Sequence, residues 1–199
     1  MSTAETEPKL DGRRLRTERS RTAIAKAVMD IVRETGMSPT ADDVAARANV
    51  SRRSVFRLFE QMDDLYAEVI VLTQAEARAR LEAPGLLEAP VAERIKVFVE
   101  RLTSLYEDVA PMRRLAERLR VQHAIIDNRL RQDTRDVSLY IKLIFGRELA
   151  GKTRAELETT LGAIELALSW HAWDALRSAQ NLSVKKAREV IRTIVGASL

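Results

Sequence analysis

The sequence contains no cysteine and only two histidines, which limits the chemistry it can carry. Without cysteine the chain can form neither a disulfide nor a thiolate metal site, so the reducing cytoplasm is a natural setting. His123 and His171 are too far apart in sequence to form a local metal-binding motif, and no Ser/His/Asp or Cys/His set is evident. We therefore expect no metal, no cofactor and no enzymatic activity.

Long apolar runs are also lacking. No stretch approaches the ~20 consecutive apolar residues that a membrane-spanning helix needs, and the N-terminus has no signal-peptide apolar region. The chain is nevertheless 46% hydrophobic over 199 residues, which is enough for a substantial core. We expect a soluble cytoplasmic protein without a membrane partner.

Acidic residues are scarce in one part of the chain only. Residues 9–59 carry twelve Lys/Arg against six Asp/Glu, whereas residues 60–199 carry twenty-one of each. The net charge of +4 is therefore concentrated near the N-terminus. Such a basic region is typical of proteins that contact nucleic-acid phosphates, although a solvated basic face is common in any soluble protein.

Residues 40–59, TADDVAARANVSRRSVFRLF, show the pattern of a helix-turn-helix. Apolar residues recur at helical spacing in the first half, and Thr40 is placed to cap its start. Asn49 interrupts this helix, and Asn accepts the left-handed conformation that a sharp turn needs. Ser51 can cap a second short helix with a cationic and hydroxylic outer face, which suits the DNA major groove.

The segment before this motif supplies a third helix. Its apolar residues lie at the spacing of one helical face, and Gly36 and Pro39 end the pattern. The residues of this stripe are Ile24, Ala27, Val28, Ile31 and Val32. A helix-turn-helix of about twenty residues cannot bury a core alone. With this third helix, the three helices can share one core.

These segments resemble the TetR family of transcriptional regulators. The resemblance rests on RTAIAKAVMDIVRETG, on the helix-turn-helix sequence above and on DDLY at the start of a long helix, and it covers roughly residues 17–66. Three positions depart from the family pattern: Asn49 stands where Gly is common, Phe56 where Tyr is common, and Met62 where a phosphate-contacting Lys is common.

The resemblance implies an all-α protein of about nine helices, with a three-helix DNA-binding head and a helical body. The expected domains are a flexible basic arm at 1–16, a helix-turn-helix domain at 17–61 and an effector-binding and dimerisation domain at 62–199. The family binds palindromic operators as homodimers and releases the double-stranded DNA when a small molecule binds, so we expect a repressor with a small apolar effector. The alternative is an effector-independent helical DNA-binding architectural or adaptor protein.

Candidate DNA contacts lie on the second helix of the motif, at the start of the first, and in the basic segment before the head. That basic segment can reach the DNA backbone or minor groove, or can be an ordinary charged tail. Phe56 and Phe59 are expected to pack within the head. The candidates for DNA binding are Thr40, Ser51, Arg52, Arg53, Ser54, Phe56, Arg57, Arg13, Arg14 and Arg16.

The remaining sequence predicts further helices. Pro111 is expected to break one of them, because proline removes a hydrogen-bond donor and clashes with the preceding turn. Thr153 and Ser183 are placed to cap the last two. The predicted helices span residues 63–83, 90–109, 112–122, 125–145, 153–179 and 183–195.

The last two predicted helices form an antiparallel hairpin, and both tryptophans lie on its first arm. Large aromatic residues are enriched at interfaces, so we expect the hairpin to pair with a second copy as a four-helix dimer interface. The same tryptophans also fit an ordinary core. The predicted interface residues are Leu161, Ile164, Leu168, Trp170, Trp173, Ile191, Ile194 and Val195.

An effector pocket is harder to locate from sequence. Apolar residues with a few polar groups among them are typical of a small-molecule site, and they fit a closed core equally well. The candidates are Leu102, Leu105, Tyr106, Met112, His123, Ile126, Leu130, Tyr140 and Ile144.

One motif match points elsewhere. Residues 146–153, GRELAGKT, fit the P-loop pattern. A P-loop needs small residues whose backbone amides wrap around phosphate, whereas RELA is bulky, charged and helix-favouring. We therefore interpret Thr153 as a helix cap and expect no nucleotide binding.

Overall fold

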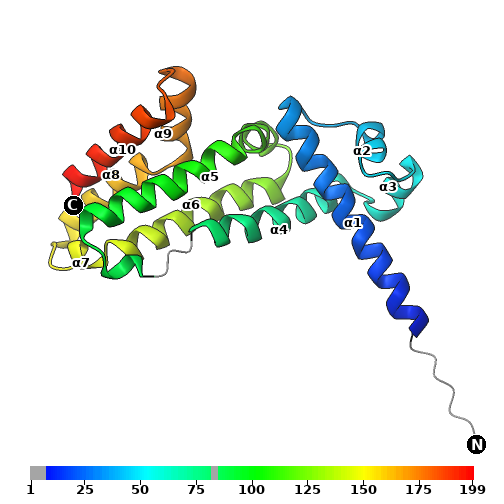
Figure 1. The fold of residues 1–199 in the computed structure, drawn as a ribbon, viewed down its shortest axis with the longest axis horizontal. Helices are drawn as coiled ribbons and strands as arrows, with labels where there is room; N and C mark the ends of the chain where they lie inside the picture. The colour runs from blue at the N-terminus through cyan, green and yellow to red at the C-terminus, as the bar shows by residue number, and fades with distance from the viewer. Residues whose placement is uncertain (1–7, 82–84) are drawn as a thin grey trace, which may run out of the picture. The chain divides into compact units, whose positions relative to one another are not determined.

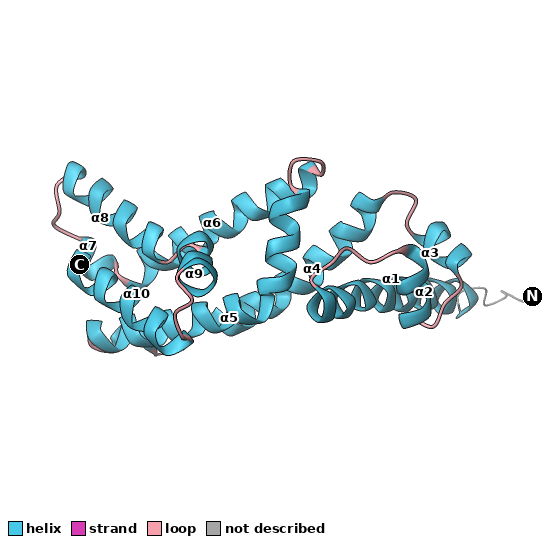
Figure 2. Cartoon of the chain, turned by 90° about the horizontal axis from the view of Figure 1, so that it is seen from above, coloured by secondary structure: helices cyan, strands magenta, loops and turns pink. Residues whose placement is uncertain are grey.

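The computed structural model describes residues 8–81 and 85–199, with the side chains of all but residues 8–11, 13, 75 and 76. Within these ranges every regular element is a helix, as Figures 1 and 2 show, which confirms the predicted all-α class. The α-helices are α1 (Pro8–Thr35), α2 (Ala41–Arg47), α3 (Arg52–Leu58), α4 (Met62–Leu81), α5 (Val91–Leu119), α6 (Ala124–Ile144), α7 (Gly146–Leu149), α8 (Arg154–Ala167), α9 (Trp170–Asp174) and α10 (Val184–Ser198), with a short 3₁₀ segment at Leu86–Glu88 and a π-helical segment at Ala175–Ala179.

The described residues form two compact units. The head unit contains the residues up to Gln74 together with Pro111–Asp127, and the body unit contains Ala75–Ala110 together with Asn128–Leu199. Helices α4, α5 and α6 each contribute to both units. No helix in the described ranges has the length and hydropathy of a membrane span.

The core of the head unit forms where the sequence predicts it. The apolar face of α1 is buried, and Val44 of α2 and Val55 of α3 pack against it. Leu115 of α5 belongs to the same cluster. The buried residues of the predicted α1 stripe are Ile24, Ala27, Val28, Ile31 and Val32.

Helix α1 begins earlier than predicted. The sequence predicts a flexible arm that extends to residue 16, whereas α1 starts at Pro8, a residue that suits a first helical position. Arg14 and Glu18 form an i, i+4 ion pair at 3.2 Å along this exposed stretch. Residues 1–7 of the predicted arm lie outside the described residues.

The expected break at Pro111 is wrong, because α5 continues through it. Proline inside a helix costs about 3 kcal/mol. On one side of Pro111, Leu102 and Leu105 are buried in the body cluster, and on the other side Leu115 is buried in the head cluster. Burial of a large aliphatic side chain contributes ~1.5–3 kcal/mol, so these residues together offset the cost of the proline.

The helix predicted across residues 153–179 is interrupted. It ends at Ala167, and the hydroxyl of Ser169 accepts a hydrogen bond from the Ala172 amide at 3.1 Å, which caps a new helix, α9. The Leu168 carbonyl accepts a hydrogen bond from the buried Tyr106 hydroxyl at 2.8 Å. Each serine or threonine cap of this kind contributes about 1 kcal/mol.

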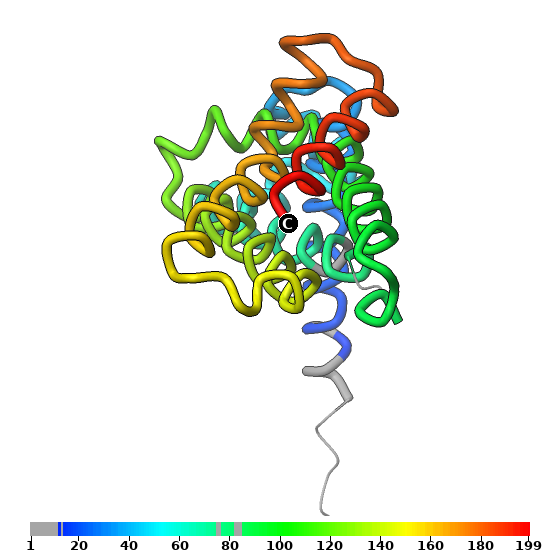
Figure 3. The backbone as a smooth tube through the Cα atoms, turned by 90° about the vertical axis from the view of Figure 1, so that its left-hand side faces the viewer, coloured from blue at the N-terminus to red at the C-terminus, as the bar shows by residue number. Residues whose placement is uncertain are grey.

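Helices α8 and α10 lie side by side in the body unit, as Figure 3 shows. The capping box of Thr153 with Glu156 and the cap at Ser183 begin these two helices as predicted. The Thr153 hydroxyl donates to the Glu156 carboxylate and accepts from the Glu156 amide, so Thr153 is a helix cap, and Gly146–Leu149 form the separate short helix α7.

Candidate nucleic-acid interface

The turn between α2 and α3 has the geometry that the sequence predicts. Asn49 adopts the left-handed conformation with φ of 52°, and the Val50 amide donates to the Ala45 carbonyl at 3.0 Å. The hydroxyl of Ser51 accepts from the Ser54 amide at 3.1 Å and so caps α3. These contacts fix where α3 begins.

Arg21 of α1 holds the other end of α3. Its Nη1 donates to the Leu58 carbonyl at 2.6 Å, and its guanidinium lies 4.3 Å from the centre of the Phe59 ring. Its Nε also donates to Glu68 of α4 at 3.2 Å. A seven-residue helix is unstable alone, so these tertiary contacts and the buried Val55 hold α3 in place.

The outer face of α3 is cationic. Arg52, Arg53, Phe56 and Arg57 are exposed, whereas Val55 points into the head core. We call these four exposed residues the α3 face. Within the described part of the chain, no carboxylate pairs with Arg53 or Arg57.

Arg52 makes two contacts that orient it. Its Nη1 lies 3.1 Å from Oδ2 of Asp42, and its guanidinium lies 5.5 Å from the centre of the Phe56 ring. Both members of the ion pair are more than half exposed, at 62% and 69%, so the pair contributes at most ~1 kcal/mol. A DNA phosphate or base edge can therefore replace Asp42 as the partner of Arg52 at little cost in free energy.

The packing role expected of Phe56 is wrong. Its side chain is 53% exposed, while Phe59, predicted for the same role, is only 5% exposed. Val55 and Phe59 already occupy the inner face of this short helix, so Phe56 is turned towards solvent. An exposed phenyl ring on this face can contact a thymine methyl group in the major groove.

The hydroxyl candidates are engaged within the head. Thr40 donates to Oδ2 of Asp43 at 2.6 Å, and this hydrogen bond lowers the pKa of the Asp43 carboxyl. The hydroxyls of Ser51 and Ser54 lie 2.9 Å apart. All three side chains therefore stabilise helix starts in the free protein, and a contact with phosphate would have to compete with these bonds.

The candidates in the basic segment lie on the first turns of α1. Arg14 and Arg16 are exposed there, and Arg14 pairs with Glu18. Arg13 belongs to the same helix, but its side chain lies outside the described residues. A helix presents these side chains at fixed spacing, unlike the arm predicted from the sequence.

The residues predicted for an effector pocket are divided between the two units, so they do not form one site within either of them. In the head unit, Nδ1 of His123 lies 2.6 Å from Oδ1 of Asp63. The His123 ring packs edge-on against the Tyr66 ring, with 4.9 Å between the ring centres. Burial raises the pKa of Tyr66. The buried members of the predicted set are Leu102, Leu105, Tyr106, Ile126, Leu130 and Ile144, while Met112, His123 and Tyr140 are half-buried.

Most residues predicted for the dimer interface are core residues of the single chain. Trp173 is 1% exposed, and its indole Nε1 donates to Oε1 of Glu107 at 3.0 Å. Only Ile194, at 42%, is exposed, and Leu161 is half-buried. The buried members are Ile164, Leu168, Trp170, Trp173, Ile191 and Val195.

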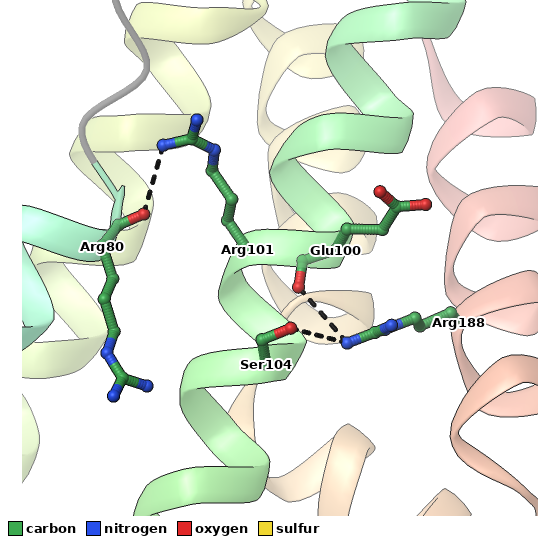
Figure 4. Close-up of a pocket in the computed structure, with 5 residues that line it drawn as sticks. All are labelled: Arg80, Glu100, Arg101, Ser104 and Arg188. Carbon is green, nitrogen blue, oxygen red and sulfur yellow. Dashed lines mark hydrogen bonds between the residues drawn. The ribbon is translucent and has the colours of Figure 1, made fainter.

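A depression on the body unit was missed by sequence reasoning. It has a volume of about 430 Å³ and is lined by side chains of three helices (Figure 4). The lining residues are Arg80, Glu100, Arg101, Ser104 and Arg188. They are separated by up to about a hundred positions in the chain, so no local pattern identifies them.

Two solved structures share this fold. A transcriptional regulator of Rhodococcus sp. Rha1 matches with a TM-score of 0.70 and 18% identity, over 90% of this chain and 96% of that chain. A TetR-family transcriptional regulator of Streptomyces coelicolor matches with a TM-score of 0.69 and 13% identity, over 89% of this chain and 80% of that chain. No protein-family model and no curated protein sequence matches. The chain has the fold of the TetR-type regulators.

Proposed function

We propose that the protein is a sequence-specific DNA-binding transcriptional regulator that inserts α3 into the major groove. The α3 face carries this proposal, because it presents three arginines and an exposed phenylalanine on a helix held at both ends. A bidentate contact between arginine and guanine contributes about 1–3 kcal/mol of discrimination. The other candidate contacts, on α1 and at Thr40, Ser51 and Ser54, would mainly position the head on the phosphate backbone.

We propose that the protein binds DNA as a homodimer through the exposed faces of α8 and α10. The hairpin remains the expected location, but the contact side chains differ from those predicted. On α8 the exposed stripe contains Ala155, Thr159, Gly162 and Leu166, and Ile194 is exposed on α10. Small residues allow two helices to approach closely, and the exposed aliphatic side chains supply apolar area.

Sedimentation of Leu166→Glu tests this dimer. Leu166 is 69% exposed, so the change should leave the fold intact and place a charge in the interface. The wild type should sediment as a dimer and the variant as a monomer at micromolar concentration. Leu139→Glu on α6, also exposed at 62%, is the matched control and should remain dimeric. A monomeric wild type would refute the proposal.

We propose that the protein acts in the cytoplasm as a repressor, with release from a palindromic operator by a small molecule. An effector can cause release only if it has different affinities for the DNA-bound and free conformations. The predicted apolar pocket residues are mostly closed core, so an apolar effector would have to open that packing. Thermal shift with hydrophobic ligands tests this part of the proposal.

Fluorescence anisotropy tests DNA binding itself. The probes are duplexes from the region flanking the gene and a shuffled duplex of the same composition, at several salt concentrations. A regulator should bind its operator ~10³-fold or more tightly than the shuffled DNA, and should lose affinity steeply with salt. Weak and equal binding to every flanking duplex and to the shuffled duplex would contradict the proposal.

A further inference from the structure

The depression on the body unit is distinguished by its charge. Arg80 ends α4, Glu100, Arg101 and Ser104 lie on α5, and Arg188 lies on α10 (Figure 4). Three arginines and one glutamate therefore line one space, although the guanidinium of Arg101 turns towards the Arg80 carbonyl. The depression has a volume of about 430 Å³ and is widely open to solvent.

The single carboxylate is directed to another arginine. Oε1 of Glu100 accepts from Arg192 at 3.4 Å, and Arg192 does not line the depression. Arg80 forms an ion pair with Asp108, and Arg101 donates to the Arg80 carbonyl at 3.4 Å. The charge of Arg80 is therefore paired, and Arg188 is the lining arginine whose partners decide whether the depression can hold an anion.

Arg188 is the group most clearly prepared for an anion. Its Nε donates to the Thr103 hydroxyl at 2.8 Å, and its Nη2 donates to the Ser104 hydroxyl at 2.7 Å and to the Glu100 carbonyl at 3.5 Å. All three acceptors are neutral oxygens. Within the described part of the chain, no carboxylate pairs with Arg188, and its Nη1 makes no hydrogen bond.

These contacts hold the guanidinium in one orientation while leaving its charge uncompensated. A fixed guanidinium loses little side-chain entropy when it binds, and its fork matches the oxygens of a carboxylate or a phosphate. Arg188 also joins α10 to α5, so a purely structural role would explain its hydrogen bonds. That role does not explain why, within the described residues, the charge of Arg188 has no carboxylate partner.

We propose that this depression binds a small oxyanion, a molecule that carries carboxylate or phosphate groups, with Arg188 as its main contact. The ligand class differs from the apolar effector expected from the sequence. The proposal rests on the proposed function only for its regulatory consequence, because anion binding is measured without DNA. As a regulator, the protein would change its operator affinity when the anion binds.

Isothermal titration of the full chain with citrate and, separately, inorganic phosphate tests the proposal, with glycerol as a neutral probe. Saturable binding of at least one anion is expected, and the better probe distinguishes carboxylate from phosphate ligands. Ser104→Asp places a carboxylate beside Arg188 and should weaken binding at least tenfold. Ala92→Asp adds the same charge twelve residues away on the same helix, ~18 Å along its axis, and should change binding less than twofold.

A second pair of variants separates ligand contact from folding. Arg188→Gln should weaken binding at least tenfold, while Arg154→Gln, an exposed arginine of α8, should bind as the wild type does. Thermal melts establish that each variant is folded. The absence of saturable binding, normal binding by Ser104→Asp, or equal losses in the variants and their controls would overturn the proposal.

Anisotropy with and without the better anion then tests regulation. A shift in operator affinity of threefold or more is expected, and it should be absent in Ser104→Asp. Anion binding without any operator binding would contradict the proposed function and leave the anion site standing. Operator binding without anion binding would support the proposed function and overturn the anion site.

Discussion

Glu107 joins two parts of the body unit through one carboxylate, and its removal has a calculable cost. Its Oε1 accepts from Trp173 Nε1 and from Arg177 Nε, both at 3.0 Å, and its Oε2 accepts from Arg177 Nη2 at 3.1 Å. Glu107→Ala leaves the buried indole N–H unpaired, which costs about 1–3 kcal/mol. The pair with Arg177 is partly exposed, so screening limits its loss to about 1 kcal/mol.

Thermal unfolding followed by circular dichroism measures this effect. The combined loss of about 2–4 kcal/mol corresponds to a melting temperature roughly 4–16 °C lower, because 1 kcal/mol shifts a chain of this size by ~2–4 °C. Glu107→Gln keeps an acceptor for the indole and should lose less than half as much. Glu158→Ala removes an exposed i, i+4 pair with Arg154 and should stay within about 2 °C of the wild type. If Glu107→Ala melted together with this control, the network would not stabilise the body unit.

Three further tests, which use five substitutions, address other parts of the structure. Phe56→Ala should weaken operator binding in anisotropy without lowering the melting temperature. Phe59→Ala should lower the free energy of unfolding by about 3–5 kcal/mol in a thermal melt. The reverse pattern would place Phe56 in the core. Asn49→Val should destabilise the head by ~1–2 kcal/mol because a β-branched residue is strained at φ of 52°. Asn49→Gly should not destabilise it, because glycine adopts this φ without strain. Equal melting temperatures of the two variants would contradict a left-handed turn. Glu148→Gln should destabilise the protein at pH 7. The hydrogen bonds from buried Arg94 hold the pKa of the Glu148 carboxyl below its ordinary value of 4.5. The ionised carboxylate therefore stabilises the fold above pH 4.5, and this stabilisation is lost as the pH falls through the lower pKa of the folded state. A difference between wild type and Glu148→Gln that stayed constant down to pH 2 would contradict this linkage.

Local features of the head were predictable because they depend on residues close in sequence. Thr40 and Ser51 cap the helices that follow them, and the apolar stripe of α1 is buried as its periodicity predicts. The direction of Phe56 was not predictable from its type, because the inner face of α3 was already filled by Val55 and Phe59.

Features that depend on distant contacts were missed. Pro111 lies inside a helix because apolar residues before and after it are buried, and a local rule for proline cannot include that contribution. The tryptophans fit an interface and a core equally well by sequence, because the buried position of Trp173 depends on Glu107, a hydrogen-bond partner more than sixty residues earlier. The depression around Arg188 likewise forms only when three helices come together.

We propose above that the α3 face reads DNA sequence. The most direct test selects bound duplexes from a randomised library with the wild-type protein, and then measures the enriched sequence by anisotropy with Arg53→Ala and Arg57→Ala. We expect a palindromic enriched sequence and a loss of about 1–3 kcal/mol of binding free energy for each arginine that contacts a base, while the melting temperature is unchanged. A library that shows no enrichment, or an enriched sequence that both variants bind as tightly as the wild type, would contradict sequence reading by the α3 face.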